Sequence, residues 1–282
     1  MDIPEHVING ETRLHVIVGD PIAQVKSPSA LTPMLLAQGH NAVVVPVHLT
    51  KEHLAAFLRA AQQIHNLDSI LVTVPHKLAC FEHCGATSER AQFLQAVNVM
   101  RRYSPDDNHS HSHSHSHGGG SGWYGEMFDG VALVRAVRAA GFEPRGQRAL
   151  LFGAGGAGSA IALALVESGV QALSIHDIDD QQRDRLLTRL AIYRDVELAK
   201  GTTDPSEFDL VVNATPSGMR EGDPLPFLPA NLRKEMFVAC VITAPALSPV
   251  VSLARDLGCA TSTGGQMHAA QQQMLVDFML GN

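Results

Sequence analysis

The chain has 282 residues, of which 45% are hydrophobic and 17% are charged, a composition typical of a globular protein that buries a core. Its formal net charge of −7 argues against a general nucleic-acid-binding protein, because such proteins present a basic surface. The polar start does not resemble a signal peptide, and no apolar run reaches the roughly 18 residues that cross a bilayer. Four cysteines without a spaced framework are typical of reduced thiols. We therefore expect a cytoplasmic protein with neither a membrane nor a nucleic-acid partner.

Strands and helices are predicted to alternate along the first part of the chain. Strands are predicted at residues 14–19, 42–49 and 69–75, a helix at 51–65, and a two-stranded ribbon at 96–101 and 123–127. This alternation indicates a small α/β domain with a mostly parallel sheet. Ser27, before Pro28, and Asp129, after the ribbon, are predicted N-caps of the helices that follow them.

A histidine-rich connector joins the two strands of this ribbon, at residues 104–122. Five of its histidines alternate with serine, which cannot build a packed core, so we expect a disordered loop. The tract could chelate a divalent metal loosely, and an expression tag would look similar. Histidine and cysteine side chains on the predicted helix after the third strand are spaced so that they could form a zinc site. The lack of a C-x2-C pair favours ordinary core or surface roles for these side chains. These candidates are His76, Cys80, His83 and Cys84, and we expect no metal site.

Residues 148–159 (RALLFGAGGAGS) carry the motif around which the second part of the chain is organised. A predicted strand at 149–152 is followed by glycines spaced as G-x-G-x-x-G and then by an Ala-rich helix. The first glycine permits a tight turn, the second a close approach of a pyrophosphate, and the third close packing of helix on strand. The pyrophosphate would bind the free N–H groups where the helix begins. The predicted coenzyme-binding residues of this loop are Gly153, Ala154, Gly155, Gly156, Ala157 and Gly158.

Asp177 strengthens this interpretation. It follows a second predicted strand, 172–176, and stands 19 residues after Gly158, where an acidic side chain binds the adenosine ribose. Its charge would repel the 2′-phosphate of NADP, and no arginine follows before Arg183, so we expect NAD to be preferred over NADP. The alternative is a tight turn of another α/β domain with a solvated aspartate. The remaining predicted elements are helices at 179–194, 250–257 and 266–280 and strands at 209–214 and 237–242.

The segment LVTVPHK places Thr73 and Lys77 at the carboxyl edge of the first sheet, where open α/β sheets bind ligands. A lysine at this point is more often a solvated residue at a helix start, so the residues alone leave its role open. Ser27 either caps its helix or presents its hydroxyl to a ligand above the sheet, and the two roles are compatible.

Six segments, in order and over nearly the whole length, resemble motifs of the shikimate/quinate dehydrogenase family. They are GDPIAQVKSP at 19–28, LVTVPHK at 71–77, QAVNV at 95–99, GEMFDG at 125–130, NATPSGM at 213–219 and GGQMHAAQQ at 264–272. The resemblance implies an α/β fold of two domains and a C-terminal helix that returns to the first. The implied ranges are 1–129 for the substrate domain, 130–262 for the Rossmann-type domain and 263–282 for the helix.

The resemblance also implies the reaction, which is reversible hydride transfer between a ring hydroxyl of an alicyclic polyol acid and nicotinamide. Lys77 and Asp129 match the catalytic pair, and Glu89 matches a nearby family site. The implied substrate-binding positions are Ser27, Thr73, Asn98, Gln272, Val25 and Thr243. Further implied coenzyme contacts are Asn213, Thr215, Val241 and Gly265.

Departures from the family pattern fall where the substrate carboxylate would bind. Val25 replaces a serine, and Thr243 stands by spacing where the family has a tyrosine. Polar motif positions are also replaced by Leu71, Val99, Met127 and Phe128. Losing one charge-assisted hydrogen bond costs about 1.5 to 3 kcal/mol, or about ten- to a hundredfold in affinity.

We therefore expect an NAD-preferring dehydrogenase that acts on quinate or another alicyclic polyol better than on shikimate. An ordinary NADP-dependent biosynthetic shikimate dehydrogenase is one alternative. A non-catalytic NAD- or ligand-binding regulator on the same fold is another. The resemblance further implies a possible homodimer.

Overall fold

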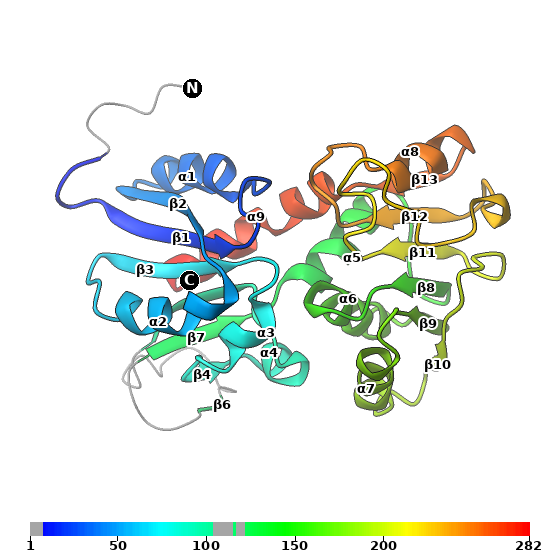
Figure 1. Ribbon diagram of the computed structural model, residues 1–282, viewed down its shortest axis with the longest axis horizontal. Coiled ribbons are helices and arrows are strands. Elements are labelled where there is room, and N and C mark those ends of the chain that lie inside the picture. The colour runs from blue at the N-terminus through cyan, green and yellow to red at the C-terminus, as the bar shows by residue number, and fades with distance from the viewer. Residues whose placement is uncertain (1–7, 104–114, 117–121) are drawn as a thin grey trace. The chain divides into compact units, whose positions relative to one another are not determined.

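The computed structural model describes residues 8–103, 115–116 and 122–282, and its contacts divide the chain into two compact units (Figure 1). Unit 1 runs to Met127 and takes up Gln272–Asn282, and unit 2 is Phe128–Gln271. The first division thus falls two residues before the expected one, and the last helix is shared between the units. None of the helices in these described ranges is long and apolar enough to cross a membrane.

The described part of unit 1 forms a seven-stranded mixed sheet in the order β2-β1-β3-β5-β7-β4-β6. Its strands are β1 (Arg13–Gly19), β2 (Ala42–His48), β3 (Leu67–Val72), β4 (Ala86–Thr87), β5 (Val99–Tyr103), β6 (His115–Ser116) and β7 (Gly122–Glu126). Its helices are α1 (Ser27–Ala37), α2 (Lys51–Ala61), α3 (Lys77–Phe81), α4 (Glu89–Leu94) and the end of α9 (Gly264–Leu280). β1 is parallel to β2 and β3, and the antiparallel pairing of β5 with β7 confirms the predicted ribbon.

Several local predictions are wrong by one to three residues. Ser27 is the first residue of α1 rather than its N-cap, because proline fits the second helical position as well as the first. Asp129 is likewise the first residue of α5 (Asp129–Ala139), where its charge still favours the helix dipole. β3 ends at Val72, short of Pro75, whose nitrogen cannot donate to a strand ladder.

The histidine-rich connector falls mostly outside the described residues. Within it, the structure places His115–Ser116, as strand β6 paired antiparallel with β4, and Gly122, the first residue of β7. The expectation of a disordered, metal-chelating loop concerns chiefly His109, His111, His113 and His117, which lie outside the described ranges.

The described part of unit 2 forms a six-stranded parallel sheet in the order β10-β9-β8-β11-β12-β13 (Figure 1). Its strands are β8 (Arg148–Phe152), β9 (Ala172–His176), β10 (Glu197–Lys200), β11 (Leu210–Asn213), β12 (Phe237–Cys240) and β13 (Ala260–Ser262). Its helices are α5, α6 (Gly156–Glu167), α7 (Asp180–Leu190), α8 (Pro249–Asp256) and the start of α9, with a 3-10 turn at Pro229–Asn231. Counted from β8, the order is 3-2-1-4-5-6, the doubly wound order with a switch point between β8 and β11. The predicted α/β fold class is confirmed.

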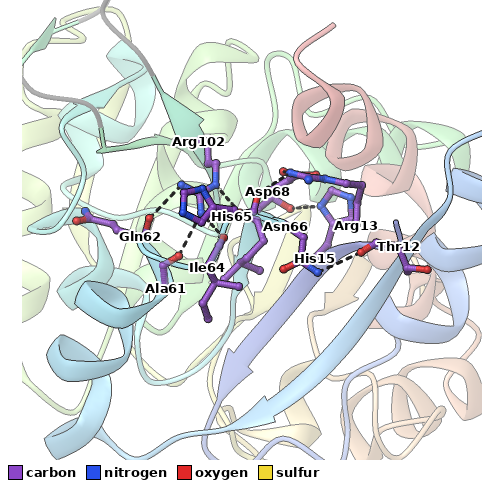
Figure 2. Close-up of polar contacts among 12 residues, drawn as sticks. Thr12, Arg13, His15, Ala61, Gln62, Ile64, His65, Asn66, Asp68 and Arg102 are labelled. Atoms are coloured by element: carbon purple, nitrogen blue, oxygen red, sulfur yellow. Dashed lines mark hydrogen bonds and ion pairs between the residues drawn. The ribbon is translucent and has the colours of Figure 1, made fainter. Parts of the chain in front are cut away.

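A polar cluster lies where β1 and β3 begin, and Figure 2 shows its hydrogen bonds. Arg13 pairs with Asp68, with Nε 2.8 Å from Oδ2. Arg102 donates to four backbone carbonyls between α2 and β3 and lies 5.6 Å from the centre of the Trp123 ring. These four acceptors are the carbonyls of Ala61, Gln62, Ile64 and Leu67. One guanidinium thereby joins the end of α2 to the start of β3, because a cation is favoured beside helix C-terminal carbonyls.

His15 belongs to the same cluster and is a buried histidine. Its side chain is 2% exposed and its Nδ1 lies 2.7 Å from Ser69 Oγ. Burial lowers the pKa of His15 from 6.5 to about 4, although Asp68 favours the charged form. Between those values the unfolded chain binds more protons than the folded one, so lowering the pH favours unfolding.

We expect the His15 contribution to the free energy of unfolding to be complete above about pH 6.5 and to fall by up to about 3 kcal/mol as the pH falls to 4. Denaturant unfolding at several pH values, followed by fluorescence of Trp123, measures it. The His15→Gln variant, which cannot ionise there, should show a correspondingly weaker pH dependence. Equal pH dependence in both proteins would contradict the assignment.

Candidate active site

Lys77 is the first residue of α3, directly after the turn that leaves β3. Its carbonyl accepts a hydrogen bond from Val97 N–H at 3.0 Å. The neighbouring His76 is fully buried, and its Nε2 lies 2.6 Å from the carbonyl oxygen of Leu49, just past β2. The backbone at Lys77 is therefore fixed from two directions, while its side chain is only partly buried.

Asn98 and Thr73 lie at the same edge of the sheet. Asn98 is 5% exposed, its N–H donates to Glu126 O at 2.9 Å, and its carbonyl accepts from the last residue of β3 at 2.8 Å. Thr73 N–H donates to Val18 O, in β1, at 3.0 Å. The structure thus brings Thr73, Lys77 and Asn98 together at the carboxyl ends of β1 and β3, where open α/β sheets bind ligands.

The positions expected to grip a carboxylate lie in the loop after β1 and at the start of α1. Ser27 is 5% exposed, and Val25 is partly exposed with its N–H donating to Ile22 O at 3.2 Å. Leu71 and Val99, which replace polar motif positions, are register partners across β3 and β5 and are 2% and 0% exposed. The replacements therefore lie beside one another in the core of unit 1.

The glycine loop of unit 2 lies at the switch point of its sheet. Gly153 has φ +99, a backbone conformation that glycine adopts readily and other residues rarely do. Its N–H donates a hydrogen bond to His176 O at 2.8 Å. A Cβ on Gly158 would lie 1.9 Å from Gly153 O, so no side chain fits there. A Cβ on Gly155 would meet only Gln182 Nε2, at 3.9 Å, and α6 begins next to it without a side-chain cap. An open glycine before an uncapped helix start fits the pyrophosphate of a dinucleotide.

Asp177 follows β9 and binds this loop directly. Its Oδ2 accepts from Ala154 N–H at 2.6 Å, and its Oδ1 accepts from Asp179 N–H at 2.8 Å. The carboxylate that the sequence assigns to the ribose thus also holds the glycine loop in place, a contact that sequence reasoning missed.

Arg183, the first arginine after Asp177, is held by two carboxylates. Its Nη1 lies 2.5 Å from Asp180 Oδ1 and its Nε 2.8 Å from Asp184 Oδ1, and the residue is 8% exposed. Hydrogen bonds from Arg183 and Lys200 lower the pKa of the Asp184 carboxyl. The i,i+3 spacing of Asp180 and Arg183 is the sequence signal that could have revealed this pairing.

The remaining positions predicted to contact the coenzyme lie at the ends of β11 and β12. Asn213 is fully buried, and its Oδ1 accepts from both the N–H and the hydroxyl of Thr215, at 3.0 and 2.6 Å. Val241 N–H donates to Asn213 O at 3.0 Å, and a Cβ on Gly264 would lie 2.4 Å from Val241 O. The start of α9, which carries the exposed Gly265, thus approaches the end of β12.

The other predicted site residues are divided between the two units. Asp129 is 4% exposed at the start of α5 in unit 2, where Thr243 also lies partly exposed after β12. Gln272 is the first residue of α9 that belongs to unit 1, and Glu89 is exposed at the start of α4. The pairing of Lys77 with Asp129 joins residues of different units and stays a prediction.

The cysteines near Lys77 are buried. Burial raises the pKa of the Cys80 thiol to about 12 and also raises that of Cys84. Within the described ranges, no group of three or more His, Cys, Asp and Glu side chains is arranged to hold a metal ion.

A doubly wound sheet with a glycine loop at its switch point defines a dinucleotide-binding protein. The family profile "Shikimate dehydrogenase substrate binding domain" matches residues 17–100. Shikimate dehydrogenase (NADP(+)) of Rubrobacter xylanophilus is 32% identical over 275 residues, covering 95% of this chain and 89% of that protein. The chain belongs to the shikimate dehydrogenase family and is an NAD(P)-dependent oxidoreductase.

Solved structures are similar over nearly the whole chain. Quinate dehydrogenase from Corynebacterium glutamicum, in complex with NAD, is 25% identical with a TM-score of 0.77, covering 96% of this chain and 94% of that one. Shikimate 5-dehydrogenase from Listeria monocytogenes, in complex with shikimate and NAD, is 23% identical with a TM-score of 0.81, covering 99% and 95%.

Two substitutions separate the steric and the ligand-binding roles of the loop. Gly158→Ala should lower the free energy of unfolding by about 3 kcal/mol or more, because its methyl group would overlap a backbone carbonyl. Gly155→Ala should fold normally and weaken NADH binding about tenfold or more, because its methyl group stands where the pyrophosphate would approach. Denaturant unfolding and titration of NADH fluorescence measure the two effects. Normal stability of Gly158→Ala would contradict the geometry, and unchanged NADH affinity of Gly155→Ala would contradict the binding role.

Proposed function

We propose that this protein is a dehydrogenase that reversibly oxidises a ring hydroxyl of an alicyclic polyol acid, such as quinate or shikimate, with NAD as its preferred coenzyme. The observation that carries the proposal is the gathering of Thr73, Lys77 and Asn98 at one sheet edge, with the backbone of Lys77 fixed on both sides. Membership of the shikimate dehydrogenase family supports the reaction class.

In this reaction Lys77 would take the proton of the reacting hydroxyl while the carbon that bears it gives up a hydride. The bound coenzyme supplies the hydride acceptor. The products are a ketone, reduced coenzyme and a protonated Lys77, which then returns its proton to solvent. Asp129 would hydrogen-bond the adjacent hydroxyl and orient Lys77, and Asn98 and Gln272 would bind ring hydroxyls. Such positioned proton transfer typically contributes about 10² to 10⁴ in rate.

We assign substrate binding to residues 1–129 with the C-terminal helix 263–282, and coenzyme binding to 130–262. The match of residues 17–100 to a substrate-binding domain supports the first range, and the glycine loop supports the second. A cytoplasmic location and a homodimer are further parts of the proposal.

The carboxylate end of the substrate is where this chain differs. Val25 presents no hydroxyl to the carboxylate, which quinate and shikimate both carry, and the similarity to a quinate dehydrogenase supports quinate as the better substrate. An ordinary biosynthetic shikimate dehydrogenase is the second candidate, supported by the relative in Rubrobacter xylanophilus. A non-catalytic regulator would have no need of Lys77.

The preference for NAD rests on charge beside the glycine loop. Asp177 would repel a 2′-phosphate, and the carboxylates of Asp180 and Asp184 already occupy the guanidinium of Arg183. A phosphate would have to displace these partners before it could use that arginine.

Initial rates at alkaline pH, with quinate and shikimate each paired with NAD and NADP, test the reaction. Lys77→Ala should lower kcat by about 10² to 10⁴, because the proton acceptor is lost. Lys51→Ala, which removes the lysine at the start of α2, is the matched control and should keep wild-type rates. No wild-type turnover in any pairing, with NAD binding intact, would favour the regulator.

Freeing Arg183 should change the coenzyme preference. The double variant Asp180→Asn with Asp184→Asn should raise kcat/KM for NADP relative to NAD by about tenfold, roughly 1.4 kcal/mol. Asp256→Asn, which removes one negative charge at the end of α8, should leave the ratio unchanged. A wild-type enzyme that already prefers NADP would show instead that the biosynthetic alternative is correct.

A further inference from the structure

Glu126, the last residue of β7, carries a carboxylate that the proposed reaction does not use. Its side chain is only 13% exposed. One oxygen, Oε1, accepts hydrogen bonds from Ser88 Oγ and from Met127 N–H, both at 2.7 Å, and Arg90 Nη1 lies 3.9 Å away. Distances of 2.7 Å are those of well-formed hydrogen bonds.

The bond to Ser88 links β7 to the start of α4. Ser88 is the N-cap of α4, and its Oγ accepts from Ala91 N–H at 3.1 Å while its hydroxyl donates to Glu126. Ser88 N–H also donates to Gly125 O at 3.1 Å. The position of α4, which begins at Glu89, is therefore tied to the end of β7.

The backbone of Glu126 contacts Asn98, at the sheet edge where Thr73 and Lys77 also lie. Glu126 O accepts from Asn98 N–H at 2.9 Å, and Glu126 is the register partner of Val99 in β5. The Glu126 carboxylate also accepts a hydrogen bond from the N–H of Met127, which is fully buried. Met127 ends the first part of unit 1, and the chain then continues to Asp129.

We propose that Glu126 is a positioning residue for the dehydrogenase reaction. Its carbonyl fixes Asn98, and its carboxylate fixes the peptide through which the chain leaves β7 towards Asp129. The inference rests on the proposed function, because Asn98 and Asp129 are the groups positioned. Without an acceptor at this point, the buried Met127 N–H and the Ser88 hydroxyl lose their partner, and the chain between them is free to shift. A misplacement of about 1 Å in an active site can cost about a hundredfold in rate.

Steady-state kinetics of four variants test the proposal, with NAD and the substrate that the wild type turns over each varied in turn while the other is saturating. Glu126→Ala should lower kcat about ten- to a hundredfold with the KM for NAD changed less than about twofold. Glu126→Gln keeps an acceptor oxygen and should stay within about threefold of wild type. Ser88→Ala removes one partner and should lower kcat about threefold to tenfold. Glu52→Ala, which removes an exposed glutamate of α2, is the control and should keep wild-type kinetics.

Amide hydrogen exchange adds a readout that does not depend on turnover. Exchange at Met127 should be faster in Glu126→Ala than in wild type and unchanged in Glu126→Gln. Should Glu126→Ala fail to fold, Ser88→Ala decides, and a wild-type kcat in that variant overturns the inference.

A folded Glu126→Ala with wild-type kcat would show a purely structural role and overturn the proposal while leaving the proposed function intact. Equal losses in Glu126→Ala and Glu126→Gln would overturn the hydrogen-bond explanation. If the wild type itself oxidises no alicyclic hydroxy acid, the proposed function fails, and the role of Glu126 fails with it.

Discussion

The candidate site depends on backbone hydrogen bonds between segments that lie near strand ends and are far apart in the chain. Lys77 O accepts from Val97 N–H, and Asn98 is held through both its N–H and its carbonyl. Each such bond contributes only about 0.5 to 1.5 kcal/mol, but together they set the positions of residues that come from three strands. Because main-chain groups do this positioning, neighbouring core side chains can change without moving the backbone at Lys77 and Asn98.

Aromatic packing attaches the C-terminal part of α9 to unit 1. The ring of Phe278, in α9, stacks on Tyr124 of β7 with centroids 5.7 Å apart, and Arg101 lies over both rings at 5.4 and 5.6 Å. These contacts fasten the last turns of α9 to the sheet of unit 1. Gln272 therefore belongs to unit 1, whereas the start of the same helix packs against the end of β12 through Gly264. One helix thus belongs to both units.

The sequence predicts what local pattern and steric necessity determine. The strands beside the glycine loop and the ribbon of β5 and β7 follow from hydrophobic periodicity. The glycine loop follows from the lack of space for a side chain at Gly153 and Gly158. The caps assigned to Ser27 and Asp129 are wrong because a helix start shifts by one residue at little cost. Contacts such as Asp177 with Ala154 and Glu126 with Ser88 join residues distant in sequence, and no local pattern specifies them.

The apolar replacements at the carboxyl end of the first sheet are best understood as a set. Leu71 and Val99 are register partners, and Val99 pairs with Glu126, the residue before Met127. A buried polar side chain needs a buried partner, so replacing one member of a polar group alone would leave the others unpaired at a cost of about 1 to 3 kcal/mol each. Replacing all of them removes that cost. Because Lys77 and Asn98 are held through main-chain groups, apolar side chains at Leu71 and Val99 leave those backbone contacts intact.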